Sequence, residues 1–187
     1  MNKFLMLAIA SLPFAATAQD QKQTFSLKGK LAGTNRTVET VYLTYKMNGK
    51  EMEDSSIVKH NAYSFSGSLD EPVEARLEGY YTENNKRQYS SGIIFLESGK
   101  ISVRSTGLLS DLQVSGSKSH AAYEDLTRLL SPLTAQNDIL RKEYQEQLKK
   151  KDVAGIAAAN VKIKAVYDSM NTVYINYAEK NPASPLA

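Results

Sequence analysis

The chain has 187 residues, of which 23 are Lys or Arg, 20 are Asp or Glu and none is Cys. The net charge of +3 is too small to indicate a nucleic-acid-binding surface. The lack of cysteine excludes disulfides, thiol catalysis and thiolate metal ligands within these residues, and two histidines are too few for a histidine-rich metal site. We therefore expect no catalytic residue, cofactor or metal ion in this chain.

Residues 1–18 have the pattern of a secretory signal peptide. Lys3 supplies a positive charge, residues 4–14 form an apolar run, and Ala16-Thr17-Ala18 is a small-residue cleavage site before Gln19. The apolar run is shorter than the roughly 20 residues that a membrane-spanning helix needs. The sequence therefore predicts an exported protein of the periplasm or cell envelope; a retained membrane anchor is the alternative.

Residues 19–116 are predicted to form an antiparallel β domain. Apolar and polar residues alternate with a period of two in short segments, separated by turn residues such as Asn48-Gly49, His60-Asn61 and Asn84-Asn85. The segments lie around Phe25 and Leu27 and at residues 41–45, 53–59, 62–69, 73–77, 93–96, 101–103 and 112–114. Seven or eight short strands predict a sandwich or an open barrel, and with the helices that follow, an α+β fold.

Residues 117–187 change to the period of helices. We expect a first helix from Ser119, as its cap, to Leu130. Ser131-Pro132 has the order of a helix start, so a second helix is expected there. A third is expected from near Asp152 to Asn181-Pro182, folded back on the second as a hairpin.

The third predicted helix carries an apolar seam. Its members, separated by three, four or seven residues, are Ile156, Ile163, Tyr167, Met170, Tyr174 and Tyr177. We expect Tyr167, Tyr174 and Tyr177 to pack on the neighbouring helix or on another domain, and they are the candidate interface residues.

One short segment contains the residue types of a serine hydrolase. Asp54, Ser55, Ser56 and His60 lie within seven residues. On a strand, Ser56 and His60 would share a face but stand about 13 Å apart. The strained Gly-x-Ser-x-Gly turn of many hydrolases is absent. A β-hairpin with His60-Asn61 as its turn is therefore the favoured interpretation.

Two further features each allow a structural interpretation and a ligand-binding interpretation. Gly116-Ser117-Lys118-Ser119 lacks the glycine spacing of a phosphate-binding loop, so a capped strand-to-helix connection is favoured over an anion site. Eleven tyrosines with no tryptophan are the second feature. Those in the β half are Tyr42, Tyr45, Tyr63, Tyr80, Tyr81 and Tyr89. They are expected at the edge of the core, with a carbohydrate or peptide surface as the alternative.

The order of segments resembles a known family. The segments are FSLKGKLAG, VYLTY, YSFSGSLDEPVEARL, IIFLESGKISV and LQVSGSKSHAAYEDL, over Phe25 to Leu130. This order resembles the domain of unknown function (DUF4369) at the N-terminus of exported thioredoxin-like proteins of Bacteroidetes. One departure is Ala62, where such a hairpin turn commonly has glycine after Asn.

The resemblance implies a function without catalysis. In that family the domain precedes a thioredoxin-fold domain whose Trp-Cys-x-x-Cys motif performs thiol–disulfide exchange. No catalytic residue carries over to a chain without cysteine. The implied role is a non-catalytic accessory domain that positions the redox domain, dimerises or binds a client protein. Residues 117–187 would then lead toward a C-terminal thioredoxin-like domain absent from these residues. The alternative is a stand-alone binding module for a glycan or a peptide.

Overall fold

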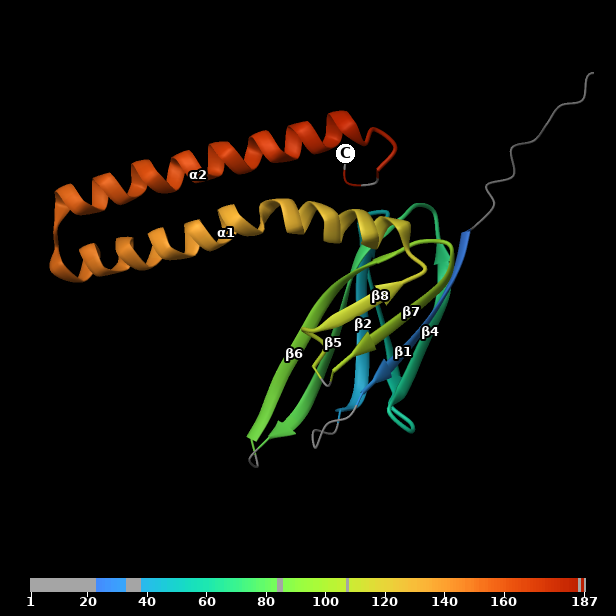
Figure 1. Cartoon of the computed structure of the whole chain (residues 1–187). Helices are drawn as coiled ribbons and strands as arrows, with labels where there is room; N and C mark the ends of the chain where they lie inside the picture. The colour runs from blue at the N-terminus through green and yellow to red at the C-terminus, as the bar shows by residue number, and fades with distance from the viewer. Residues whose placement is uncertain (1–22, 33–37, 84–85, 107, 185, 187) are drawn as a thin grey trace, which may run out of the picture.

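The computed structural model describes residues 23–32, 38–83, 86–106, 108–184 and 186. The predicted signal peptide and the predicted Asn84-Asn85 turn lie outside the described residues. The strands are β1 (Gln23–Leu31), β2 (Val38–Met47), β3 (Lys50–Ile57), β4 (Ala62–Leu69), β5 (Val73–Glu83), β6 (Lys86–Leu96), β7 (Gly99–Ser105) and β8 (Leu112–Ser115). The helices are α1 (Lys118–Lys150) and α2 (Val153–Lys180) (Figure 1). The predicted α+β fold is confirmed.

The strands form two four-stranded sheets that face each other as a sandwich. Sheet A has the order β4-β1-β7-β8, and sheet B has the order β3-β2-β5-β6. Neighbouring strands are antiparallel in every pair except β1 and β7, which run parallel from Phe25↔Gly99 to Leu31↔Ser105. The parallel pair differs from the expected antiparallel arrangement, because a period of two reveals strands but not their direction.

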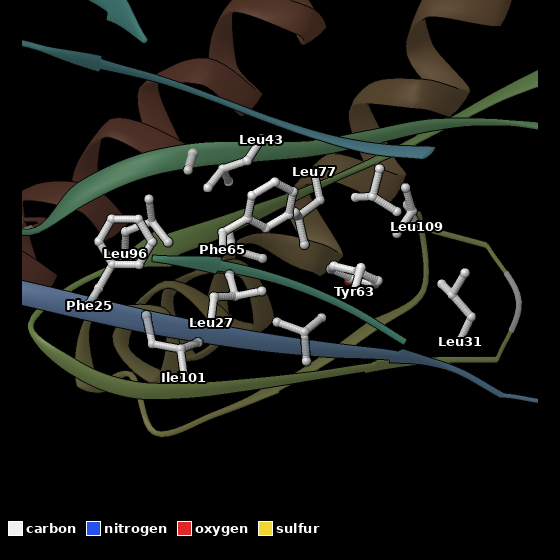
Figure 2. Close-up of a cluster of buried hydrophobic side chains, with 14 of the residues drawn as sticks. Phe25, Leu27, Leu31, Leu43, Tyr63, Phe65, Leu77, Leu96, Ile101 and Leu109 are labelled. Carbon is white, nitrogen blue, oxygen red and sulfur yellow. The ribbon is translucent and has the colours of Figure 1, made fainter. Parts of the chain in front are cut away.

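The core lies between the two sheets. Figure 2 shows side chains of both sheets meeting there, with Leu27 and Ile101 from sheet A and Leu43 and Leu77 from sheet B. Leu27 and Leu77 have no exposed surface, and the intervening polar residues face outward. In β1 and β5, the alternation in the sequence therefore indicates which side of the strand is buried.

Two tight turns have the same backbone geometry. Asn48 and Gly49 join β2 to β3 with φ of 51° and 76°, and His60 and Asn61 precede β4 with φ of 52° and 60°. Positive φ at both central residues is the requirement of a type I′ turn. The predicted His60-Asn61 turn is confirmed, and Ala62 after it does not prevent this geometry.

The helical region has two helices where the sequence predicted three. Residues 118–150 are one helix, and Pro132 lies inside it. Proline has no N–H to donate to the carbonyl four residues earlier, which belongs to Arg128. The Ser131 hydroxyl donates to that carbonyl oxygen at 3.0 Å. Ser131 therefore satisfies the group that Pro132 leaves free, and the helix continues.

The two helices pack as an antiparallel coiled coil. Buried and half-buried side chains recur at alternating steps of three and four in both. In α1 they are Tyr123, Leu126, Leu130, Leu133, Asn137, Leu140, Tyr144 and Gln147. In α2 they are Ile156, Ala159, Ile163, Val166, Met170, Val173 and Tyr177. The hairpin extends away from the sandwich, which contacts the start of α1 (Figure 1). Neither helix is long and apolar enough to cross a membrane.

Candidate functional site

The start of α1 is held by a carboxylate that directly follows β6. Glu97 accepts hydrogen bonds at 2.8 Å from the backbone N–H groups of Lys118 and Ser119. The Ser119 hydroxyl also donates to it. The helix cap is Ser117, whose hydroxyl oxygen accepts from the His120 N–H at 3.0 Å, so the prediction of Ser119 as the cap is wrong. Ser119 instead joins the helix to sheet B.

The contacts of Glu97 decide between the two interpretations of Gly116–Ser119, a capped strand-to-helix connection and an anion-binding site. Burial alone would raise the pKa of the Glu97 carboxyl, but the hydrogen bonds from Ser119, Lys118 and Ser117 lower it below its ordinary value. The first N–H groups of α1 therefore bind an anion that belongs to the protein itself. The plain interpretation, a capped strand-to-helix connection, fits the structure.

The hydrolase-like segment has structural contacts. The Ser56 hydroxyl oxygen on β3 accepts from the Ser64 N–H on β4 at 3.1 Å, and Asp54 accepts from the Ser55 N–H at 2.7 Å. His60 lies in the turn, where its backbone φ is positive. The predicted turn is therefore confirmed, but the predicted hairpin is wrong: β3 pairs with β2 in sheet B and β4 pairs with β1 in sheet A, so the turn carries the chain from one sheet to the other.

The tyrosines of the sheet half divide into two groups. Tyr63 is buried in the core, and Tyr45 and Tyr81 pack against it. Tyr42, Tyr80 and Tyr89 point to the outer face of sheet B. Tyr45 and Tyr81 match the expectation of core-edge residues, Tyr63 is more deeply buried than expected, and the second group forms the candidate surface.

Tyr80 and Tyr89 form a pair on this outer face. They are directly opposite on β5 and β6, their ring centroids lie 5.6 Å apart, and they are 43% and 50% exposed. The Arg87 guanidinium lies 3.9 Å from the centroid of the Tyr80 ring. The Tyr89 hydroxyl donates to Glu78 at 2.7 Å, and Arg76 lies 3.8 Å from the same carboxylate. These contacts fix the orientation of two large, exposed aromatic rings.

Two hollows lie on the outer face of sheet B, one on each side of the cross-strand pair of Tyr42 and Glu78. One of about 440 Å³ lies between Tyr42, Tyr80 and Arg87. The other, of about 800 Å³, lies over the next rows of β2, β3 and β5. Its charged lining residues are Lys46, Glu51, Glu53, Glu74, Arg76 and Glu78. Four carboxylates against two cations make this hollow acidic, so it favours a cationic ligand.

The acidic lining was missed in the sequence. Glu74, Arg76 and Glu78 alternate along β5 with the buried side chains of Ala75 and Leu77, so the three share the outer side of this strand. Glu51 and Glu53 were not singled out, because only the pairing of β3 with β2 brings them beside that row. Within the described ranges, no three His, Cys, Asp or Glu side chains lie close enough to hold a metal ion.

The three candidate interface tyrosines of α2 have different environments. Tyr177 is buried, and its hydroxyl donates to the Ala122 carbonyl at 3.1 Å. Tyr167 accepts from Arg141 at 2.6 Å and is 41% exposed. Tyr174 is 49% exposed. Tyr177 packs on the neighbouring helix, whereas Tyr167 and Tyr174 flank the seam.

The fold and this surface define a β-sandwich with an attached helical hairpin. The family model described as domain of unknown function (DUF4369) matches residues 25–123, just over half of the chain, so the chain belongs to this family. No curated protein matches the chain. A solved structure described as "NMR structure of the protein from Eubacterium rectale" is 18% identical and covers 52% of this chain and 92% of its own, with a TM-score of 0.30.

Proposed function

We propose that this chain is a non-catalytic accessory domain that binds an extended, basic polypeptide on the outer face of sheet B. The observation that carries the proposal is the exposed Tyr80–Tyr89 pair beside an acidic hollow. Tyrosine rings supply a rigid apolar contact with a polar end, which suits recognition of a polypeptide. The carboxylates then select for lysine or arginine side chains.

We further propose that the domain serves an exported thioredoxin-like thiol–disulfide oxidoreductase. Support comes from the DUF4369 match and from the signal-like first residues. The lack of cysteine means that thiol exchange would require residues outside this sequence. Binding an unfolded client beside a redox domain would raise the client's local concentration at the active site. An in-frame Trp-Cys-x-x-Cys segment downstream of Ala187 would support this role, and its absence would favour a stand-alone module.

The binding surface is tested by titrating the ¹⁵N-labelled chain with two unstructured peptides. One alternates lysine and valine, and the other has glutamate in place of lysine. The expected result is saturable shifts of the Tyr80, Tyr89 and Glu78 amides with the basic peptide alone. These shifts should weaken with added salt, because exposed charges are screened.

Matched variants identify the contact residues. Replacing both Tyr80 and Tyr89 by Ala should weaken binding about tenfold or more, the equivalent of roughly 1.4 kcal/mol. Tyr174→Ala, on α2, is the control and should leave affinity unchanged. A neutral hexasaccharide that shifts the same amides, with no response to the basic peptide, would replace the polypeptide by a glycan ligand. Shifts confined to other surfaces would contradict the proposed site.

A further inference from the structure

Helix α2 has a second heptad seam on the side away from α1. Its members are Ala154, Ala157, Val161, Lys164, Asp168, Asn171, Ile175 and Ala178, again at alternating steps of three and four. We call this set the outer seam. Val161 is 71% exposed and Ile175 is 59% exposed. The opposite side of α2 packs on α1, and Val166, near the middle of the helix, is buried there.

The outer seam differs from the corresponding side of α1. The outward positions of α1 include the charged residues Asp125, Arg128, Lys142, Glu146 and Lys149, all exposed. In the outer seam of α2, only Lys164 and Asp168 are charged, and most other members are Ala, Val or Ile. Helices that are apolar on more than one side are normally covered on each of them. Alanine at a seam also allows two helix backbones to approach closely.

The order of residues along the outer seam is self-complementary under two-fold symmetry. Lys164 and Asp168 lie two residues on either side of position 166, and Ala157 and Ile175 lie nine residues on either side. An antiparallel pair of α2 helices centred there brings each Lys164 to Asp168 of the second copy. It also brings each small Ala157 to the large Ile175 of that copy. Every contact occurs twice, as an isologous interface requires.

The charges favour a second copy of this chain as the occupant. Within one chain the Lys164 Nζ lies 2.7 Å from the Asp168 carboxylate, on exposed side chains. In the pair, two lysines and two aspartates alternate in sign around the symmetry axis. A parallel arrangement in register would instead place like charges together, so the charge order also selects the antiparallel direction.

The described part of the chain leaves this face of α2 exposed. Position 166 is at the middle of α2, so an antiparallel pair centred there overlaps along the whole helix. A helix of this length extends about 42 Å. α1 lies between α2 and the sandwich (Figure 1), and the outer seam is on the side of α2 opposite the buried Val166. We propose that this chain forms an antiparallel homodimer through the outer seam of α2, with the two sandwiches at opposite ends of the paired helices.

Single charge reversals and their mixture test the inference by sedimentation velocity over a concentration series. The wild-type chain should approach twice the monomer mass, and Lys164→Glu and Asp168→Lys should each remain monomeric. Mixing the two variants should restore the dimer, because the carboxylate introduced at position 164 of one chain then faces the lysine introduced at position 168 of the other. The intrahelical pair stays broken in both chains, so the restoration reports the contact between chains alone.

The controls separate association from folding and from ligand binding. Arg128→Glu reverses a similarly exposed charge, one that pairs with Asp125 on α1, and should leave the dimer intact. Ile175→Glu should abolish dimerisation while the far-ultraviolet circular dichroism stays that of the wild type. Binding of the basic peptide at sheet B should survive in these variants. A monomeric wild type, or a mixture that stays monomeric, would overturn the proposed dimer.

Discussion

Glu97 and Ser119 join sheet B to the first turn of α1 through two hydrogen bonds, one from the Ser119 N–H and one from its hydroxyl. Beside this contact the Phe95 and Tyr123 rings pack with centroids 5.4 Å apart. The junction therefore has one charged and one aromatic contact, and both fix where the hairpin leaves the sandwich.

The first prediction concerns this junction. Glu97→Gln removes the charge and places an amide N–H₂ against a backbone N–H donor, so the free energy of unfolding should fall by about 1–2 kcal/mol. Urea denaturation measures the change. Glu71→Gln, in the exposed turn before β5, is the control and should differ little from the wild type.

The difference between wild type and Glu97→Gln should depend on pH. The pKa of Glu97 is lowered in the folded state, so its stabilisation is complete above the ordinary value of 4.5. It is lost as the pH falls through the lowered pKa. A difference that grows on acidification would contradict this assignment.

A second pH effect is predicted at His120. Its side chain is 5% exposed, and its Nδ1 has no hydrogen-bond partner. Burial lowers the pKa of His120 and outweighs Glu124, whose carboxylate lies 3.3 Å from Nε2 and raises it. The unfolded chain thus binds the proton more readily, and stability should fall as the pH decreases below the ordinary 6.5.

The measurement is the urea midpoint between about pH 8 and pH 5, the range around the ordinary histidine pKa. His120→Gln should reduce the slope over this range. His60→Asn removes the exposed histidine of the turn and serves as the comparison. A slope that disappears with His60 instead of His120 would show that the buried imidazole is not responsible.

Removing the hydroxyl of Tyr63 and removing that of Tyr177 should change the free energy of unfolding in opposite directions. The Tyr63 hydroxyl is buried without a hydrogen-bond partner, whereas that of Tyr177 donates to the Ala122 carbonyl. Tyr63→Phe should raise the free energy of unfolding by about 1 kcal/mol, and Tyr177→Phe should lower it by about the same amount. Thermal and urea denaturation measure both. A loss of stability in Tyr63→Phe would mean that its hydroxyl has a partner in solution.

Pro132 should limit the stability of α1. Pro132→Ala supplies the missing N–H to the Arg128 carbonyl, and the free energy of unfolding should rise by about 1–2 kcal/mol. Circular dichroism during urea denaturation detects the change. Pro72→Ala, just before β5, is outside any helix and should not stabilise the chain. A destabilised Pro132→Ala would show that the proline is required for packing of the hairpin.

The sequence predicts the sheets better than the helices. The period of two locates the strands and gives the buried side of β5 from Val73, Ala75 and Leu77, because burial on one side needs only local alternation. The parallel partner of β1 is far along the chain, and no local pattern reports it. The exposed Tyr80–Tyr89 pair is also set by the register between strands.

The sequence predicts one helix too many, because the Ser-Pro pattern of a helix start also occurs inside α1. Ser131-Pro132 has the order of a helix start, but the Ser131 hydroxyl satisfies the carbonyl that the proline leaves free. The cap is Ser117 and not the predicted Ser119, because Glu97, brought there by the fold, accepts from the Ser119 N–H and hydroxyl. Tyr167 and Tyr174 have the spacing of a seam, but the contact with α1 is centred on Val166 and Val173 instead.

The parallel pairing of β1 with β7 sets the order in which the chain can complete its fold. β1 lies in the interior of sheet A, yet Phe25 pairs with Gly99, which is made only after β2 to β6 have been synthesised. In a nascent chain, one edge of β1 therefore stays unpaired until β7 has been synthesised and can pair with it. Such distant pairing slows folding and extends the time during which a bare edge can aggregate. Any factor that shields β1 during that interval would raise the yield of the folded domain.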